Sequence, residues 1–286
     1  MSLKIIPAGA ALGAEITGVD LTKNIDDATY KQLKQAFYQH EVVYFRDQDI
    51  GDDDHLRFSA GIGELRRILS RTNAPSLKPP EIFTLSNIIE NGKHIGSYDS
   101  GLFWHTDGAY ATQPHAVSIL RAVEVPYKDG RPLGATCFAS MTAAYDALSS
   151  AMKHRLEGLQ ALHSRLLRDE KSNQLGRKRA ELTAEQKKNA EAVHPVVRIH
   201  PITKRKCLYV SEGYTARILG ISDDESKNLL EELTAHCVQP QFRYTHDWRV
   251  HDVLMWDDCS TQHRATFDYA LPLRRLMYKT TLATYS

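Results

Sequence analysis

The stretch Val253-Leu254-Met255-Trp256 is apolar throughout and ends at a turn that begins with Asp257 and Asp258. A compact apolar run bounded by turn residues is typical of a buried strand. Strand-like segments at 241–244 and 275–282 lie on either side of it in the sequence. The last part of the chain is therefore predicted to be rich in β-structure, and the central strand leads through a turn toward His263.

The remainder of the chain alternates short strand patterns with a few helical ones. Many short strands with interleaved helices favour a mainly β fold, a β-sandwich or jelly roll flanked by helices. The predicted helices are 27–40, 53–60, 140–147, 152–161 and one that follows the capping residue Ser222. The predicted strands are 42–45, 82–85, 117–123, 136–138 and a hairpin formed by 196–199 and 206–210.

Length and composition are ordinary for a globular protein. The 286 residues include 42% hydrophobic and 25% charged residues, and no repeat or linker divides them, so we expect a single domain over 1–286. A formal net charge of +1 gives no support for a nucleic-acid or membrane-surface partner. Cys137, Cys207, Cys237 and Cys259 are scattered without C-x-x-C pairing, which favours reduced thiols in a cytoplasmic protein.

The segment 165–191 is strongly charged and poor in apolar residues. Such a composition is typical of a solvated helix or an excursion from the fold. Long insertions are also often functional, so a helical, lid-like insertion over a substrate pocket is the alternative interpretation.

The most informative polar motif is Phe103-Trp104-His105-Thr106-Asp107-Gly108. Residues two apart on an extended segment project from the same face, so His105 and Asp107 can converge on one point. An H-x-D pair alone is weak evidence, but His263 follows the C-terminal turn and supplies a third candidate ligand. Two imidazoles and one carboxylate form the facial triad of non-haem Fe(II) oxygenases, which leaves coordination positions open. Arg275 begins the last strand, and its guanidinium can pair with a carboxylate through two hydrogen bonds.

With these motifs in place, the sequence resembles the taurine dioxygenase and 2,4-dichlorophenoxyacetate dioxygenase family (TauD/TfdA) of Fe(II)/2-oxoglutarate-dependent oxygenases. The stretches 12–21 and 43–48 resemble the opening strands of the family. Trp104-His105-Thr106-Asp107 matches its first two metal ligands, and His263 with Arg275 matches its third ligand and its 2-oxoglutarate arginine. Thr136 aligns with a family threonine that contacts the same end of 2-oxoglutarate. The resemblance covers nearly the whole chain.

The resemblance implies a double-stranded β-helix, the cupin-like jelly roll, flanked by helices. It implies the cofactors Fe(II), 2-oxoglutarate and O2, with iron held by His105, Asp107 and His263 and with 2-oxoglutarate held by Thr136 and Arg275. The implied reaction couples decarboxylation of 2-oxoglutarate to succinate and CO2 with oxidation of a substrate C–H bond. No catalytic residue beyond the metal ligands is required, and a homo-oligomer, a dimer or tetramer, is expected by analogy with the family.

Four residues after Arg275 comes Lys279, where family members that act on taurine or aryloxyalkanoates carry an anion-binding arginine. The sequence therefore predicts a small anionic substrate, such as a sulfonate, an aryloxyalkanoate or an amino-acid-like carboxylate. Tyr98, Phe103 and Tyr214 are the further candidates for substrate contacts. Aromatic residues are more often part of a core than of a binding site.

Three alternative functions remain open at this stage. A zinc hydrolase can use the same His105, Asp107 and His263 ligands to activate water. A thiol enzyme would pair Cys259 with His263, although no third residue is apparent to orient that pair. The third alternative is a jelly-roll binding protein without catalytic activity.

Overall fold

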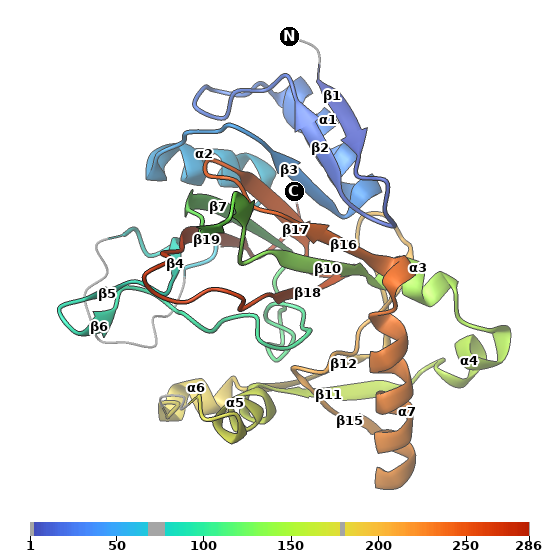
Figure 1. Cartoon of the computed structure of the whole chain (residues 1–286). Coiled ribbons are helices and arrows are strands. Elements are labelled where there is room, and N and C mark those ends of the chain that lie inside the picture. The colour runs from blue at the N-terminus through green and yellow to red at the C-terminus, as the bar shows by residue number, and fades with distance from the viewer. Residues whose placement is uncertain (1–2, 68–77, 178–180, 286) are drawn as a thin grey trace.

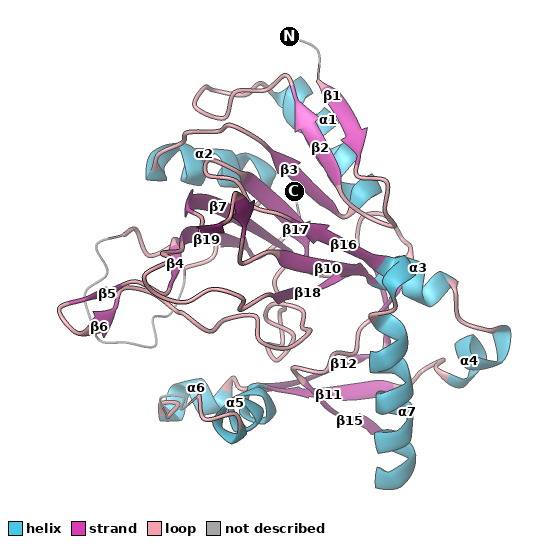
Figure 2. Ribbon diagram, in the orientation of Figure 1, coloured by secondary structure: helices cyan, strands magenta, loops and turns pink. Residues whose placement is uncertain are grey.

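The computed structural model describes residues 3–67, 78–177 and 181–285. Its main body contains a large β-sheet and a smaller one stacked on it, with helices on the outer side of the large sheet (Figure 1). A third sheet lies at the opposite end, and helices flank it on either side (Figure 2). Within the described ranges, every helix is too short or too polar to cross a lipid bilayer.

The large sheet has seven strands, with β17 and β7 near its centre. β17 pairs antiparallel with β3 and with β7, so that Met255 lies between Val43 and Ile119. All three of these side chains are fully buried, which explains why the strand reads as an unbroken apolar run. In spatial order the strands are β1 (Lys4–Pro7), β2 (Ala14–Thr17), β3 (Val42–Phe45), β17 (Val253–Asp257), β7 (Val117–Glu124), β19 (Leu276–Leu282) and β4 (Phe83–Ser86).

The smaller sheet carries the C-terminal histidine. Its strands are β16 (Arg243–His246), β10 (Thr136–Ser140) and β18 (Thr261–Ala265), with β10 in the middle. Phe138 of β10 is fully buried, and its ring centroid lies 5.7 Å from that of Trp256 on β17. Leu120 and Met277 belong to the same cluster, so the inner faces of the two sheets form one core.

Two helices cover the outer face of the large sheet, α1 (Asp27–His40) and α2 (Asp52–Ile62). The carboxylate of Asp26 accepts a hydrogen bond from Thr29 N at 2.7 Å and caps the first helix. Leu33, Ala36 and Phe37 are the buried residues of α1, and their spacing places them on one face of the helix. Phe37 belongs to the core cluster that includes Met255.

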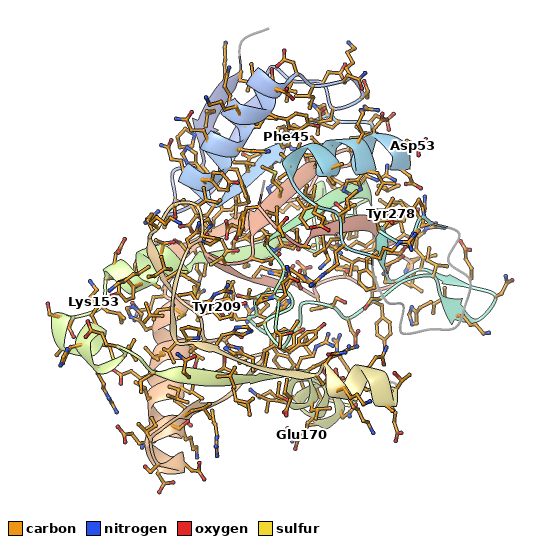
Figure 3. All side chains as sticks on the ribbon, turned by 180° about the vertical axis from the view of Figure 1, so that it is seen from behind. Phe45, Asp53, Lys153, Glu170, Tyr209 and Tyr278 are labelled. Atoms are coloured by element: carbon orange, nitrogen blue, oxygen red, sulfur yellow. The ribbon has the colours of Figure 1, made fainter. Side chains whose placement is uncertain are left out.

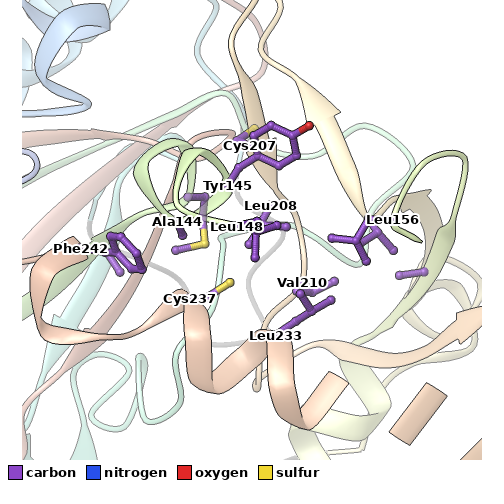
Figure 4. Close-up of a cluster of buried hydrophobic side chains, with 14 of the residues drawn as sticks. Ala144, Tyr145, Leu148, Leu156, Cys207, Leu208, Val210, Leu233, Cys237 and Phe242 are labelled. Atoms are coloured by element: carbon purple, nitrogen blue, oxygen red, sulfur yellow. The ribbon is translucent and has the colours of Figure 1, made fainter. Parts of the chain in front are cut away.

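The third sheet forms a separate layer whose middle strand is β11. Figure 4 shows Leu233 and Cys237 of α7 packing near Leu208 and Val210 in the cluster beside it. Its strands are β11 (Gln160–Ser164), β12 (Glu191–Pro195) and β15 (Thr215–Leu219), and the adjoining elements are α3 (Met141–Asp146), α4 (Ser150–Arg155), α5 (Arg165–Gln174), α6 (Ala184–Lys188), α7 (Asp223–Cys237), the 3-10 helix η1 (Pro240–Phe242) and the hairpin of β13 (Val197–Ile199) and β14 (Lys206–Leu208). Two short hairpins, β5 (Ile89–Glu90) with β6 (Lys93–His94) and β8 (Tyr127–Lys128) with β9 (Arg131–Pro132), complete the described elements.

The structure confirms most elements predicted from the sequence, including the mainly β architecture with flanking helices. The helix 27–40 has the predicted bounds, Ser222 caps α7, and the hairpin is formed by β13 and β14. The helix predicted over 152–161 is wrong in its second half, because α4 ends at Arg155 and β11 begins at Gln160. Gly158 has a φ of 75° in the left-handed region, and the following residues pair with both neighbouring strands.

The packing of α1 on the large sheet gives a first prediction. Phe37→Ala removes a fully buried ring, so we expect the free energy of unfolding to fall by about 3–5 kcal/mol. Urea denaturation followed by circular dichroism measures this loss. Lys31→Ala, on the exposed side of the same helix, should change stability by less than about 0.5 kcal/mol. Equal losses in the two variants would contradict the packing described.

Candidate metal centre

His105 and His263 face each other across an isolated antiparallel bridge. The backbone N–H of His105 donates to the carbonyl of His263 at 3.1 Å, and the reverse hydrogen bond is 2.9 Å long. The centroids of the two imidazole rings are 4.2 Å apart. This backbone pair therefore holds the segment that carries the first histidine against β18, which carries the second.

Asp107 completes the group. Its Oδ1 lies 3.5 Å from Nε2 of His105, and its Oδ2 lies 3.9 Å from Nε2 of His263. One candidate ligand atom from each of the three side chains lies within 4.8 Å of the other two. The structure thus brings together the three residues that the sequence predicts as metal ligands.

The surroundings of the two imidazoles bear on which ring nitrogen can bind a metal. Nδ1 of His105 lies 2.8 Å from the carbonyl oxygen of Phe103, and since a carbonyl only accepts, this nitrogen carries the proton. In the neutral ring, the lone pair is then on Nε2, which faces Asp107. Burial, and secondarily the neighbouring His105, hold the pKa of His263 well below its usual range, so the ring of His263 is neutral.

The carboxylate of Asp107 is held in its charged form. Burial alone would raise its pKa, but other contributions, of which the charge of Lys279 is the largest, outweigh burial and hold the pKa well below its usual range. Nζ of Lys279 lies 2.6 Å from Oδ2, and Ser118 Oγ lies 3.2 Å from the same oxygen. Oδ2 of Asp107 therefore lies within hydrogen-bonding distance of Lys279 and Ser118, whereas Oδ1 of Asp107 is directed toward His105.

Asp258 and His115 adjoin this carboxylate. No motif or spacing in the sequence indicates a role for His115 or for Ser118. Ligand atoms of Asp107, His115 and Asp258 also lie within 4.8 Å of one another. Ser118 Oγ is 2.8 Å from Asp258 Oδ2, and the indole N–H of Trp256 donates to the other oxygen of Asp258 at 2.9 Å. Burial and then the charge of Asp107 raise the pKa of Asp258 well above its usual range, which favours a protonated carboxyl.

A buried arginine lies four residues before Lys279 in the sequence. Arg275 is 7% exposed, its guanidinium donates to the carbonyl oxygen of Gly134 at 3.4 Å, and among the described residues it forms no ion pair with a carboxylate. Its neighbour Arg274 forms two hydrogen bonds of 2.9 Å to Glu124 at the surface. The two side chains therefore face opposite sides of the chain, as the strand alternation predicts.

Thr136 lies near both the arginine and the histidines. Along the pair of β10 and β18, Thr136 is opposite Ala265, while Phe138 is opposite His263. Gly134, two residues before Thr136, has a φ of 73°, and a Cβ there would lie 3.0 Å from Nε of Arg275. A glycine is therefore needed where the chain passes the guanidinium. The hydroxyl oxygen of Thr136 accepts from the indole N–H of Trp248 at 3.0 Å.

The residues predicted to contact substrate lie in different environments. The ring of Tyr214 is 5.8 Å from that of His105, and Phe103 lines a small cavity together with His105. Tyr98 is instead 41% exposed, and its ring stacks on His94 with the centroids 4.1 Å apart. The full lining of the cavity is Gly101, Leu102, Phe103, His105, Arg168 and Gly213. Nothing in the local sequence pattern of Arg168 or Gly213 indicates that they lie beside His105.

The turn that leads to His263 is organised by Asp257. Its Oδ1 accepts hydrogen bonds from the backbone N–H groups of Cys259 and Ser260, each at 2.8 Å. Its Oδ2 lies 2.7 Å from Nε2 of His200. Cys259 itself is 2% exposed, and its sulfur lies 3.8 Å from that of Cys207, so it is not placed as an exposed nucleophile.

Comparison with known proteins agrees with this geometry. Residues 4–281 match the model of the taurine catabolism dioxygenase TauD, TfdA family. The chain is 31% identical over 295 residues to (S)-phenoxypropionate/alpha-ketoglutarate-dioxygenase of Delftia acidovorans, which covers 99% of this chain and 95% of that protein. It is 30% identical over 279 residues to pentalenolactone F synthase of Streptomyces arenae, covering 94% of this chain and 92% of the relative. The crystal structure of AAD-2 with Mn(II) and N-oxalylglycine superposes with a TM-score of 0.82 at 29% identity, over 100% of this chain and 99% of that one.

The fold and these relatives define an oxidoreductase of the 2-oxoglutarate-dependent dioxygenase class, as the sequence predicts. Fe(II), 2-oxoglutarate and O2 are the cofactor and co-substrates of this class. The chain belongs to the taurine catabolism dioxygenase TauD, TfdA family.

The contact of His200 with Asp257 predicts a pH dependence of stability. Burial lowers the pKa of His200, but the hydrogen bond and charge of Asp257 outweigh burial and raise that pKa above its usual value. The stabilisation is therefore fully present below about pH 6.5, the ordinary histidine value, and is lost as the pH rises through the raised pKa. We expect urea denaturation of the wild type to show that the free energy of unfolding falls as the pH rises from about 6.5 through the raised pKa of His200. In His200→Gln, the fall over the same pH range should be smaller. His154→Gln, at an exposed histidine, is the control. Identical pH profiles of the wild type and His200→Gln would refute the contribution.

Proposed function

We propose that this dioxygenase couples the decarboxylation of 2-oxoglutarate to succinate and CO2 with oxidation of a C–H bond in a small organic anion. A sulfonate, an aryloxyalkanoate or an amino-acid-like carboxylate is the proposed substrate class. The single observation that supports the proposal most strongly is the buried group of His105, Asp107 and His263. The proposed scaffold is one domain over 1–286, a double-stranded β-helix made by the two stacked sheets.

The donor set fits a ferrous ion. Two neutral imidazoles and one charged carboxylate are the ligands that non-haem Fe(II) prefers, and three protein ligands leave positions for other molecules. Iron bound by His105, Asp107 and His263 supplies the activation of O2. The protein side chains contribute what surrounds that chemistry. Phe103 fixes the tautomer of His105, and Lys279 and Ser118 fix one oxygen of Asp107.

Arg275 and Thr136 are proposed to bind the distal carboxylate of 2-oxoglutarate. The guanidinium is buried and, among the described residues, forms no direct ion pair with a carboxylate, although Tyr269 and Asp268 offset part of the effect of burial on its pKa. An incoming carboxylate would supply the directly paired negative charge. Thr136 already accepts from Trp248, so its own hydroxyl hydrogen remains a donor for the same carboxylate.

The alternatives are less well supported. A zinc hydrolase would leave the buried Arg275 without a role, and the relatives with named activities given above are not hydrolases. A binding protein without catalysis has no need of a ligand set with an adjoining anion site. Oxygen uptake together with succinate formation discriminates between these functions.

Location and assembly are also proposals. All four cysteines are free, which supports a reducing compartment and hence a cytoplasmic protein. A homo-oligomer, a dimer or tetramer, is proposed by analogy with the family.

Removal of a proposed metal ligand should abolish the reaction. We expect His105→Ala to lose iron-dependent succinate formation from 2-oxoglutarate and to bind less than one Fe(II) per chain in an anaerobic titration. His154→Ala removes an exposed imidazole and should behave as the wild type. Full succinate formation by His105→Ala would refute the ligand assignment, and the circular dichroism spectrum shows whether the variant is folded.

The role of Arg275 is tested by co-substrate affinity. Loss of a charge-assisted pair predicts that Arg275→Ala raises the Kd of 2-oxoglutarate by about 10- to 100-fold, whereas Arg275→Lys raises it less. Binding is measured anaerobically with Fe(II). Arg274→Ala is the matched control, because its guanidinium pairs with Glu124 at the surface. An unchanged Kd in Arg275→Ala would exclude the proposed contact.

A further inference from the structure

The cation that the sequence predicts for an anionic substrate is already engaged. Nζ of Lys279 lies 2.6 Å from Oδ2 of Asp107. Both side chains are largely buried, with 14% and 13% exposure. Breaking a buried ion pair on one side leaves the other charge uncompensated. Binding of a substrate anion by Lys279 would therefore compete with the contact that fixes Asp107.

A second cation lies beside the metal ligands. Among the described residues that line the cavity next to His105, the cationic side chain is Arg168 of α5. It is 13% exposed, and its Nη1 lies 3.2 Å from Oδ1 of Asp169. Burial lowers the pKa of this guanidinium, but Tyr214, Asp169 and Asp99 nearby outweigh burial and raise it. A guanidinium has five N–H donors, so the contact with Asp169 does not use up its capacity for an anion.

The helix that carries Arg168 is attached to the loop that packs on His105. Ser164 caps α5 by accepting from Leu167 N at 3.3 Å, and Lys171 Nζ donates to the carbonyl oxygen of Glu212 at 2.7 Å. The N–H of the next residue, Gly213, donates to the carbonyl oxygen of Trp104 at 3.0 Å. A Cβ added at Gly213 would lie 3.2 Å from the Cβ of His105. Figure 3 shows Glu170 on the outer side of the same helix. The position of Arg168 is thus coupled to that of the metal ligand.

Aromatic rings accompany this cation. The rings of Tyr110 and Tyr214 are 5.2 Å apart, and Tyr214 is next to His105. The guanidinium of Arg165, on the first turn of α5, lies over the Tyr110 ring at 5.6 Å. Apolar ring faces beside a guanidinium suit a molecule that has an apolar body and a negatively charged end.

We propose that Arg168 binds the anionic group of the primary substrate, a carboxylate or sulfonate attached to an apolar body. This inference rests on the proposed function, since it assigns the substrate anion to one residue of the same site. It gives the charged segment 165–191 a role in recognition, through α5, and it leaves Lys279 as the partner of Asp107.

The test compares matched anionic and neutral probes on the protein loaded anaerobically with Fe(II) and 2-oxoglutarate. The pairs are phenoxyacetate with phenoxyethanol and benzenesulfonate with benzyl alcohol, and binding is followed by the change in visible absorption of the ferrous complex. We expect the wild type to prefer the anion of at least one pair. Arg168→Gln should raise the Kd of that anion by about 10- to 100-fold and leave the neutral partner unchanged. Arg168→Lys should recover part of the lost affinity for the anion, because it restores the positive charge without the two parallel N–H donors of a guanidinium.

Lys187→Gln is the control, since it removes one exposed positive charge from the same segment. The inference is overturned if the wild type binds no anion of the panel, if it binds the neutral partners equally well, or if Arg168→Gln weakens both members of a pair to the same extent. In each of these cases, an Fe(II)/2-oxoglutarate complex that forms normally and releases succinate leaves the proposed 2-oxoglutarate-dependent reaction standing. The first two outcomes count against an anionic substrate as well, whereas the third counts against Arg168 alone. A wild-type protein that forms no such complex overturns both.

Discussion

The backbone bridge between His105 and His263 is the interaction on which the site depends. Two hydrogen bonds, of 3.1 and 2.9 Å, join residues that are far apart in the sequence. Opposed residues of an antiparallel bridge project their side chains to the same side, so the pairing alone places the two imidazoles together. Asp107 follows by the alternation of an extended segment. The geometry of the three candidate ligands is therefore a consequence of backbone pairing.

That bridge requires β18 to have a fixed register, and the buried turn before it provides one. Asp257 is 1% exposed, and burial of a carboxylate is costly unless donors surround it. Here the N–H groups of Cys259 and Ser260, the ring of His200 and the hydroxyl of Tyr285 all contact its oxygens. A fully satisfied polar network admits few alternative arrangements, so the turn fixes where His263 begins its side of the bridge.

Sequence periodicity could predict the parts of the site that depend on local alternation. His105 with Asp107, and Arg275 facing away from Arg274, both follow from the period of two in extended chain. The contact of Arg168 with the cavity depends on how α5 is attached through Lys171 and the loop at Gly213, and no local pattern encodes that attachment. The helix predicted over 152–161 failed for a related reason, because β11 is defined by its two neighbouring strands. Pairing across the fold overrides local propensity there.

Charge explains why the site is suited to an acidic co-substrate. The Asp107 carboxylate is matched by Lys279, and the raised pKa of Asp258 keeps a second negative charge from developing beside it. Arg275 then remains as a buried positive charge that forms no direct ion pair among the described residues, although Tyr269 and Asp268 offset part of the effect of burial on its pKa. A buried charge without a partner is costly to the folded state, and a ligand that supplies the partner recovers part of that cost on binding. In the proposed function, 2-oxoglutarate supplies the direct carboxylate partner of Arg275, so that binding recovers part of the stability that burial of this charge costs.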